Sequence, residues 1–343
     1  GWQCLLVLDP GLTAALATGL AAYVVGLVPG LPAKAVAVVT ILAAAAANAA
    51  GLRIAAGLAR VLAFAKVALL LLIVGWGFGA RLGDGARFFP LATPHPGSAP
   101  LLPALAGAVL GAFFSFGGWW DVSKVAGEVR EPQRTLPRAL VWGVVVATGV
   151  YIATSAVFFY LVPLAQVGSG ETFAALAGTA LFGSRGAEAF SAVVILCVGS
   201  SLLAYMTAAP RVYYAMGRDG LGIGAVGSLH PRTGAPVRAI AIQAVLACLL
   251  VLVGRFDQIA AYFIFVLVLF LGASAAGLFR LRRRGGSPPY STPGFPLTAY
   301  AFLAMTAAVL VLLAIGNPLQ SALGVGVVAL GLPVYAVLHH RRV

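Results

Sequence analysis

Residues 111–132 read Gly-Ala-Phe-Phe-Ser-Phe-Gly-Gly-Trp-Trp-Asp-Val-Ser-Lys-Val-Ala-Gly-Glu-Val-Arg-Glu-Pro, and this stretch decides the fold. It begins as an apolar, membrane-crossing helix and reaches Gly117-Gly118 partway through. Lipid cannot hydrogen-bond free peptide groups, so a backbone broken at that depth must be buried in protein or line a cavity. Interrupted spans mark binding sites in secondary transporters. The stretch therefore predicts a membrane-embedded site for a polar solute; the alternative is a glycine kink that only packs against a neighbouring helix.

The composition of the whole chain is that of a membrane protein. Of its 343 residues, 61% are hydrophobic and only 9% are charged, whereas a soluble domain carries roughly 25% charged residues. The net charge of +13 fits the excess of Lys and Arg in the cytoplasmic loops of membrane proteins. No basic face interleaved with polar residues is present, so we expect no nucleic-acid partner. The cysteines and histidines show no metal-ligand spacing, and we expect no metal and no cofactor.

Apolar blocks of the length that a bilayer demands of a helix predict an all-α, multi-span fold with about ten spans. The predicted spans are Cys4–Val25, Lys34–Asn48, Arg53–Gly77, Ala104–Glu128 (broken), Leu140–Leu161, Ala187–Tyr213, Val237–Val253, Ile259–Leu281, Leu297–Ile315 and Ala322–Leu338.

The basic residues divide unevenly between the two sets of connections. Of the 22 Lys and Arg residues, fifteen fall on one side and five on the other, and Arg60 and Lys66 lie within the third span. Because cytoplasmic loops carry the excess of Lys and Arg, the first side is predicted to be cytoplasmic. Both termini then face the cytoplasm, in the inner or plasma membrane of the cell.

The broken span supplies the candidate substrate site. Unwinding at 114–118 would leave carbonyls free for an ammonium group, and a half-helix beginning near Trp119 would point its positive end at the gap. Together these groups suit a zwitterion. The aromatic rings of this stretch could close over an apolar side chain of the solute. For each ring, ordinary packing between helices is the alternative. The candidate substrate-binding residues are Phe114, Ser115, Phe116, Gly117, Gly118 and Trp119.

Lys66 is the candidate ion-coupling residue. It lies near the middle of Arg53–Gly77, about 16–20 Å from either helix end at 1.5 Å per residue, which is beyond easy snorkelling. A charge at that depth is costly and is a functional hypothesis by default. It could replace a bound cation or carry a proton; capping by backbone carbonyls is the alternative. Ser200 and Ser201 join it as candidates, although such hydroxyls often bond back to their own helix.

The remaining charged residues give weaker signals. Asp9 lies about one turn inside the first span and could lie at the membrane–water interface. Glu128 is predicted to belong to a cytoplasmic ion-pair cluster with Arg130 and Arg134. No nucleophile elbow, Walker loop or carboxylate pair within one span occurs, so we expect neither an enzyme nor a primary pump.

Three motifs together carry a family resemblance. Gly117-Gly118-Trp119, followed by Gly127–Pro132 and Arg134–Arg138, resembles the sixth span and following loop of the amino acid–polyamine–organocation superfamily. The closest resemblance is to the L-type amino-acid transporter branch and its bacterial relatives. The other two motifs resemble the loops after the family's eighth and tenth spans. They are Arg211–Gly220 with His230-Pro231 and Pro236, and Leu281–Arg284 with Pro289-Tyr290 and Pro293–Pro296.

The resemblance implies twelve spans, ten of them in two inverted five-span repeats. On that register the chain is one transporter domain, residues 1–343, that begins at the third span. Residues 1–77 would be the remainder of the first repeat, 103–281 the second repeat and 297–338 two additional spans. The family's other unwound segment, which holds the substrate carboxylate, would precede this chain, so a chain without it could be inactive.

The resemblance also implies a function. Lys66 matches the fifth-span lysine that takes the place of a sodium ion in sodium-independent members. The expectation is secondary active transport of amino acids by alternating access, through exchange or proton coupling. The solute should be neutral, because apart from Lys66 the mid-membrane region offers no strong charge. The alternatives are a polyamine or cationic amino-acid carrier and, from another class, a membrane-embedded enzyme or an inactive truncated scaffold. The expected partners are the amino acid and membrane lipid; Trp120-Asp121 departs from the commoner family residues and leaves the side-chain preference open.

Overall fold

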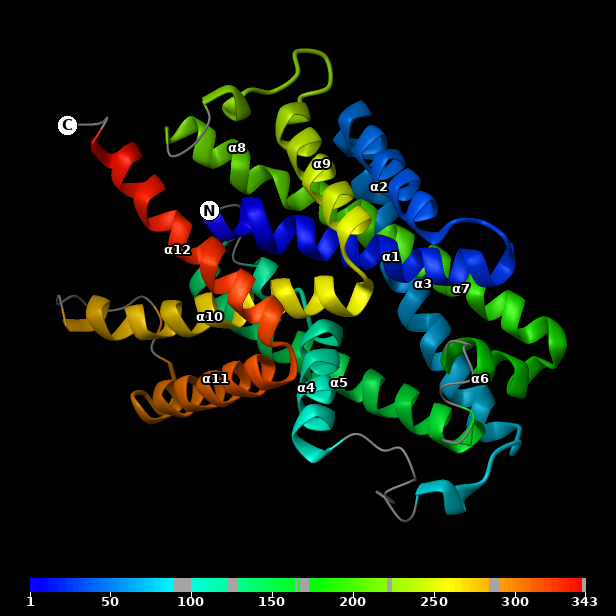
Figure 1. Ribbon diagram of the computed structural model, residues 1–343. Coiled ribbons are helices and arrows are strands. Elements are labelled where there is room, and N and C mark those ends of the chain that lie inside the picture. The colour runs from blue at the N-terminus through cyan, green and yellow to red at the C-terminus, as the bar shows by residue number, and fades with distance from the viewer. Residues whose placement is uncertain are drawn as a thin grey trace.

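The computed structural model describes residues 1–88, 100–122, 129–163, 166, 173–220, 224–283, 290 and 292–340. These residues form helices joined by turns and loops, without a strand among them (Figure 1). The helices are α1 (Asp9–Leu27, preceded by a π-helical turn at Cys4–Leu8), α2 (Ala33–Ala50), α3 (Leu52–Gly79), α4 (Leu101–Ser115), α5 (Pro132–Leu161), α6 (Phe173–Phe182), α7 (Ser184–Ala208), α8 (Pro210–Arg218), α9 (Val237–Val253), α10 (Phe256–Arg283), α11 (Leu297–Gly316) and α12 (Pro318–His340). Short 3-10 helices lie at Gly85–Phe88 and Gly224–Gly227.

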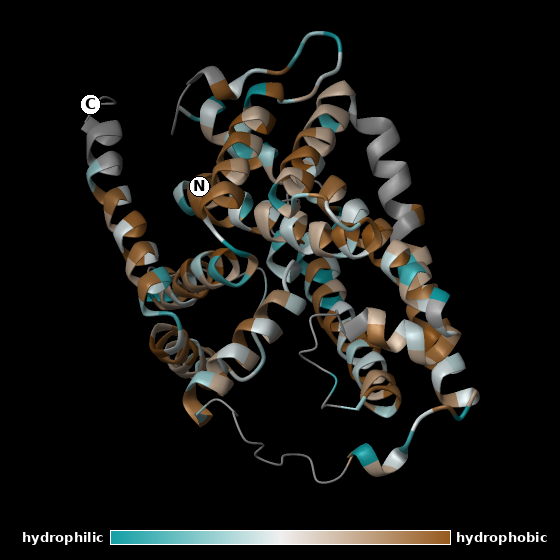
Figure 2. Cartoon of the chain, turned by 45° about the vertical axis from the view of Figure 1, so that its right-hand side comes forward, coloured by the Kyte–Doolittle hydropathy of each residue, from teal (hydrophilic) through white to brown (hydrophobic). Residues whose placement is uncertain are grey.

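The described helices are long and apolar enough for a multi-span membrane protein. Seven helical segments meet the length and hydropathy of a membrane span, and three shorter apolar helices lie at Phe64–Gly79, Val237–Val253 and Pro318–Pro333. Each of the ten predicted spans overlaps one of these segments, which confirms the predicted all-helical, multi-span fold class. Figure 2 shows hydrophobic residues along nearly every helix.

Two predicted span boundaries differ from the structure because of prolines. α5 begins at Pro132, not at Leu140, and proline is favoured in the first turn of a helix, where its missing N–H has no partner to lose. The predicted span Ala187–Tyr213 is divided into α7 and α8 at Ala209, because Pro210 begins the second helix.

The centre of the bundle is built around α1, which contacts α2, α7, α9 and α10. Its buried face is rich in small residues, including the fully buried Ala14, Ala17 and Ala21, and small residues let helices approach closely. A Cβ at Gly11 would lie 2.6 Å from the Cβ of Phe263. Only glycine therefore permits the observed distance between α1 and α10.

A second, smaller core joins α3, α5, α6 and α7. Ile73, Val157, Leu181 and Phe190 are buried within it. The loop after α3 closes this end of the molecule, because the Arg87 guanidinium donates hydrogen bonds of 2.9 and 2.8 Å to the last carbonyls of α5, those of Tyr160 and Leu161. These contacts fix the end of α5 against α3.

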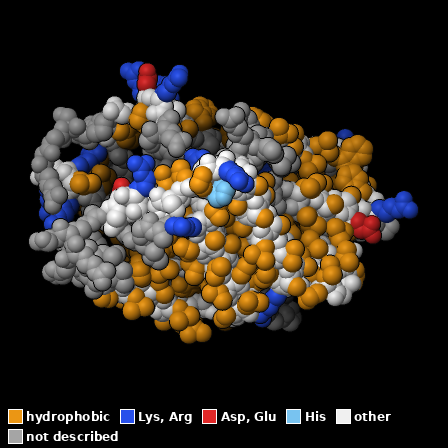
Figure 3. Space-filling model, turned by 90° about the horizontal axis from the view of Figure 1, so that it is seen from above, with side chains coloured by type: hydrophobic (Ala, Val, Ile, Leu, Met, Phe, Trp, Pro, Cys, Tyr) orange, Lys and Arg blue, Asp and Glu red, His pale blue; other side chains and the backbone are white. Residues whose placement is uncertain are grey.

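The outside of the bundle is strongly apolar. Large hydrophobic side chains stand exposed along the helices, among them Trp142 at 66%, Ile152 at 65% and Leu196 at 65%. Figure 3 shows hydrophobic side chains over a broad area of one face. In water such a surface would aggregate, whereas lipid tails cover it without cost. The N-terminal end of the described chain is tied to the middle of α12, since the Trp2 indole donates a 2.9 Å hydrogen bond to the Val327 carbonyl.

Candidate substrate site

The backbone breaks at the predicted position. α4 ends at Ser115, residues 116–118 form a turn, and residues 119–122 form one 3-10 turn. The Gly117 N–H bonds to the Phe114 carbonyl at 3.1 Å, three residues back, where an α-helix would bond four back. Gly118 has φ +112°, a conformation that costs little only for glycine. The half-helix expected from Trp119 is seen only as this 3-10 turn, and residues 123–128 lie outside the described part.

Tyr151 of α5 holds the broken end of α4. Its hydroxyl donates a 2.7 Å hydrogen bond to the Ser115 carbonyl. Its ring meets Phe116 edge-on, with the centroids 5.1 Å apart. The Ser115 hydroxyl bonds back to the Gly111 carbonyl at 2.8 Å. The break is therefore braced by a neighbouring helix, and Tyr151 is a residue of this region that the sequence did not indicate.

A cavity of about 680 Å³, which we call the central cavity, opens beside the break. This volume lies within the range of about 300–1,000 Å³ that is usual for small-molecule sites. The lining comes from four helices around the broken segment, and it includes all five predicted residues from Phe114 to Gly118. The lining residues are Leu12, Leu16, Leu70, Ala112, Phe114, Ser115, Phe116, Gly117, Gly118, Asp121, Tyr151, Thr154, Ser155, Phe158, Ser201 and Tyr205.

Trp119, the sixth predicted residue, does not line the central cavity. It lies beyond the turn, on the walls of two smaller cavities of about 230 and 210 Å³. Phe116 lines all three cavities and so separates them. The change of chain direction at Gly118 carries Trp119 away from the central cavity, although it shares the wall of a smaller cavity with Phe116 and Gly117.

Lys66 meets one of the two predicted serines. Its ammonium donates a 2.7 Å hydrogen bond to the Ser201 hydroxyl, which in turn donates to the Cys197 carbonyl at 3.1 Å. Ser201 lines the central cavity, so the lysine charge reaches its wall through this hydroxyl. Ser200 bonds back to the Cys197 carbonyl at 2.8 Å and faces a groove among α1, α2 and α7. Successive helical residues point about 100° apart, and this angle separates Ser200 from Lys66.

Asp9 is the centre of a buried polar cluster, which the sequence did not indicate. Asp9 is fully buried, and its partners lie on α7 and α8. Its carboxylate accepts hydrogen bonds from the hydroxyls of Tyr205 at 2.5 Å and Tyr213 at 2.8 Å. Nearby, Gln243 of α9 donates to the Thr13 hydroxyl at 2.9 Å. Since Tyr205 also lines the central cavity, this cluster reaches the cavity wall.

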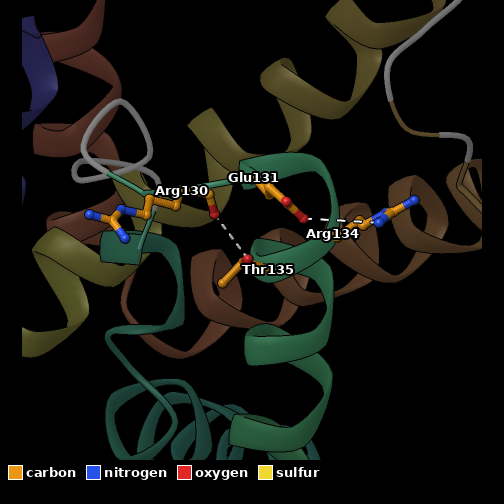
Figure 4. Close-up of polar contacts among 4 residues, drawn as sticks. All are labelled: Arg130, Glu131, Arg134 and Thr135. Atoms are coloured by element: carbon orange, nitrogen blue, oxygen red, sulfur yellow. Dashed lines mark hydrogen bonds and ion pairs between the residues drawn. The ribbon is translucent and has the colours of Figure 1, made fainter.

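The basic segment at the start of α5 is exposed. The Glu131 carboxylate lies 4.0 Å from the Arg134 guanidinium, and the Thr135 hydroxyl bonds to the Arg130 carbonyl at 3.1 Å (Figure 4). Both ionic side chains are largely in solvent, where such pairs contribute little stability. Glu128, the predicted member of an ion-pair cluster here, lies outside the described residues. Among the residues that the structure describes, no group of three or more His, Cys, Asp and Glu could hold a metal ion.

A multi-span helical protein with a broken helix on the wall of a cavity that carries several polar side chains has the architecture of a solute transporter. A sequence profile described as "Amino acid permease" matches residues 3–338. The chain therefore belongs to the amino acid permease family, a family of transporters and not of enzymes. The resemblance noted from the sequence motifs is confirmed.

The chain is similar to several characterised transporters. It is 28% identical over 240 residues to the serine/threonine exchanger SteT of Bacillus subtilis, covering 68% of this chain and 55% of that protein. It is 23% identical to the human cystine/glutamate transporter, over 97% of this chain and 67% of that protein. It is 24% identical to the mouse b(0,+)-type amino acid transporter 1, over 86% of this chain and 61% of that protein. The chain thus spans between about half and two thirds of the length of these relatives.

Proposed function

We propose that this chain forms most of a sodium-independent amino-acid transporter, which moves neutral amino acids across the cytoplasmic membrane by alternating access. Transport would run by exchange or by proton coupling. The observation that carries the proposal is the broken end of α4 on the wall of the central cavity. Peptide groups released there can bind the charged ends of a zwitterion, which lipid-exposed helices cannot do.

The contact between Lys66 and Ser201 supports sodium independence. The ammonium is half-buried in the middle of α3 and donates to a hydroxyl on the cavity wall. A fixed cation at this position would do the work of a bound sodium ion, and it would repel one that approached. A lysine can also release its proton, so the same group suits proton coupling.

The names of the relatives agree with transport of amino acids. By their names, one is an exchanger of serine and threonine, both neutral and small, another transports cystine and glutamate, and a third is an amino acid transporter. We propose that the chain keeps two inverted repeats, with 1–77 as part of the first and 103–281 as the second. The uneven distribution of Lys and Arg supports cytoplasmic termini.

A second candidate is a carrier of cationic amino acids or polyamines, and one observation favours it. Asp121 lines the central cavity, so the wall of this cavity carries an acidic residue. A carboxylate in a cavity attracts a cationic side chain. The human cationic amino acid transporter 4 is also similar, with 29% identity over 60% of this chain and 33% of that protein.

The test uses this chain together with the two spans that the family resemblance places before it; we call this the extended protein. Purified extended protein is reconstituted in liposomes, and uptake of labelled alanine, serine, leucine, lysine and putrescine is measured. The liposomes are prepared with and without sodium, with and without internal amino acid, and at two pH values. The proposal predicts uptake of neutral amino acids without sodium, accelerated by internal amino acid or by a proton gradient. Uptake of lysine or putrescine alone would favour the second candidate, and uptake of none of the five would reject both.

A further inference from the structure

The joined ends of α10 and α11 carry a basic cluster that no acidic residue balances. Arg280, Arg282 and Arg283 lie in the last turn of α10, and we call these three residues the arginine cluster. None of their guanidinium groups forms an ion pair with a described residue. The sequence has no Asp or Glu after Asp257. The chain beyond α10 therefore adds no acidic side chain that could neutralise the cluster.

The length of α10 places the arginine cluster at the depth of the lipid headgroups. α10 has 28 residues, which is about 42 Å at 1.5 Å per residue, and a bilayer with its headgroup layers is about 40–45 Å thick. A helix of this length that crosses the membrane ends within the headgroup layer. Leu281 and Leu297 are exposed at the same end and need an apolar covering, whereas the exposed Tyr300 is typical of the membrane–water interface. Figure 1 shows α10 and α11 side by side, with this end at the edge of the bundle.

Arg282 is held in place by a row of aromatic rings. Its guanidinium carbon lies 3.8 Å from the ring centroid of Phe295. The Phe295 ring packs against Phe279, with the centroids 5.3 Å apart, and Phe279 packs against Tyr300 at 4.9 Å. The Nε atom of Arg282 is buried, so the terminal nitrogens are the ones that a ligand can reach. A guanidinium fixed in this way can bind a phosphate through two parallel N–H groups and loses little entropy on binding.

We propose that the arginine cluster binds the phosphate of an anionic phospholipid such as phosphatidylglycerol, whose acyl chains cover Leu281 and Leu297. Basic residues beside a membrane span attract anionic headgroups in preference to zwitterionic ones. A lipid fits better than a soluble phosphate, because charged and apolar side chains lie together at one depth of the membrane. This inference goes beyond the proposed function, since it does not depend on the solute that the chain carries.

Native mass spectrometry of the purified extended protein tests the site, because it counts the lipids that stay bound. The protein, in a neutral detergent, is offered equal amounts of phosphatidylglycerol and phosphatidylcholine with the same acyl chains. The wild-type protein is expected to prefer phosphatidylglycerol. Each arginine near an anionic lipid contributes roughly fivefold in affinity. Arg282→Gln should therefore lower the ratio of bound phosphatidylglycerol to phosphatidylcholine by about fivefold, and replacement of all three arginines by glutamine should lower it by at least about tenfold.

Arg255→Gln is the matched control. Arg255 lies just before the other end of α10 and is paired with Asp257, with the charged atoms 3.6 Å apart, so this variant should leave the ratio unchanged. Arg283 is exposed, and Arg283→Gln provides the same test should the triple variant fail to fold; it is expected to lower the ratio by about fivefold.

Four results would overturn the inference. One is equal binding of the two lipids by the wild-type protein, and another is an unchanged ratio in Arg282→Gln and Arg283→Gln. A third is a loss of preference in Arg255→Gln as large as that in Arg282→Gln, because the preference would then follow the total charge and not the cluster. The fourth is displacement of phosphatidylglycerol by an equal concentration of inorganic phosphate, which would identify the cluster as a site for a soluble anion.

Discussion

Replacing a single glycine tests whether the backbone at the end of α4 is held broken. Gly118 has φ +112° and open space around its Cβ position. Alanine at this position would therefore suffer backbone strain and no clash. A residue held in such a sparsely populated conformation costs about 1–3 kcal/mol, and Gly118→Ala should lower the free energy of unfolding by that amount.

Gly111→Ala is the matched control, because Gly111 lies inside α4 and also has open space around its Cβ position. Alanine is better than glycine inside a helix by about 0.5–1 kcal/mol, so this variant should be more stable than the wild-type protein. The two substitutions add the same methyl group and are expected to act in opposite directions. The unfolding free energy is measured by denaturation with sodium dodecyl sulfate in mixed micelles, followed by helical circular dichroism. If Gly118→Ala proved as stable as Gly111→Ala, the reasoning would be refuted, since α4 would then continue as an ordinary helix through residue 118.

Three further substitutions test the groups around the central cavity. Lys66→Met should reduce sodium-free uptake by at least about tenfold. A hydrogen bond from a charged group is worth about 1.5–3 kcal/mol, and 1.4 kcal/mol corresponds to a tenfold change. Full uptake by this variant would disprove a coupling role for Lys66. Ser201→Ala should lower the unfolding free energy by about 1.5–3 kcal/mol through loss of the lysine contact, and Ser200→Ala should change it by less than about 0.5 kcal/mol. Equal effects of the two serine variants would contradict the assigned contact. Tyr151→Phe should cost about 0.5–1.5 kcal/mol in the same denaturation assay, since the Ser115 carbonyl loses its donor; an unchanged stability would show that this hydrogen bond does not brace the break.

The sequence was sufficient to predict where the helical spans lie and where the backbone of α4 breaks. Length and hydropathy alone place a helix at each predicted span, because a bilayer permits few alternatives to a helix. The pair Gly117-Gly118 locates the break because glycine is the residue that tolerates a positive φ at little cost. The contact between Lys66 and Ser201 agrees with the expectation that a mid-membrane charge needs a polar partner.

The rest of the cavity wall could not be predicted from the sequence. α5 is apolar on most of its surface, so no periodic polar face shows that Tyr151 and Thr154 line the cavity. The hydrogen-bond partners of Asp9 could not be predicted, because the tyrosines of α7 and α8 that bond to it lie about 200 residues later in the chain. The separation of Ser200 from Lys66 depends on the rotation of α7, which packing fixes and hydropathy does not reveal.

A structure of the extended protein with a bound neutral amino acid tests the central claim most directly. The account predicts that the solute occupies the central cavity, with its amino group within about 2.7–3.2 Å of carbonyls at the broken end of α4. A solute bound elsewhere, or an α4 that runs unbroken past Gly118 against lipid, would contradict it.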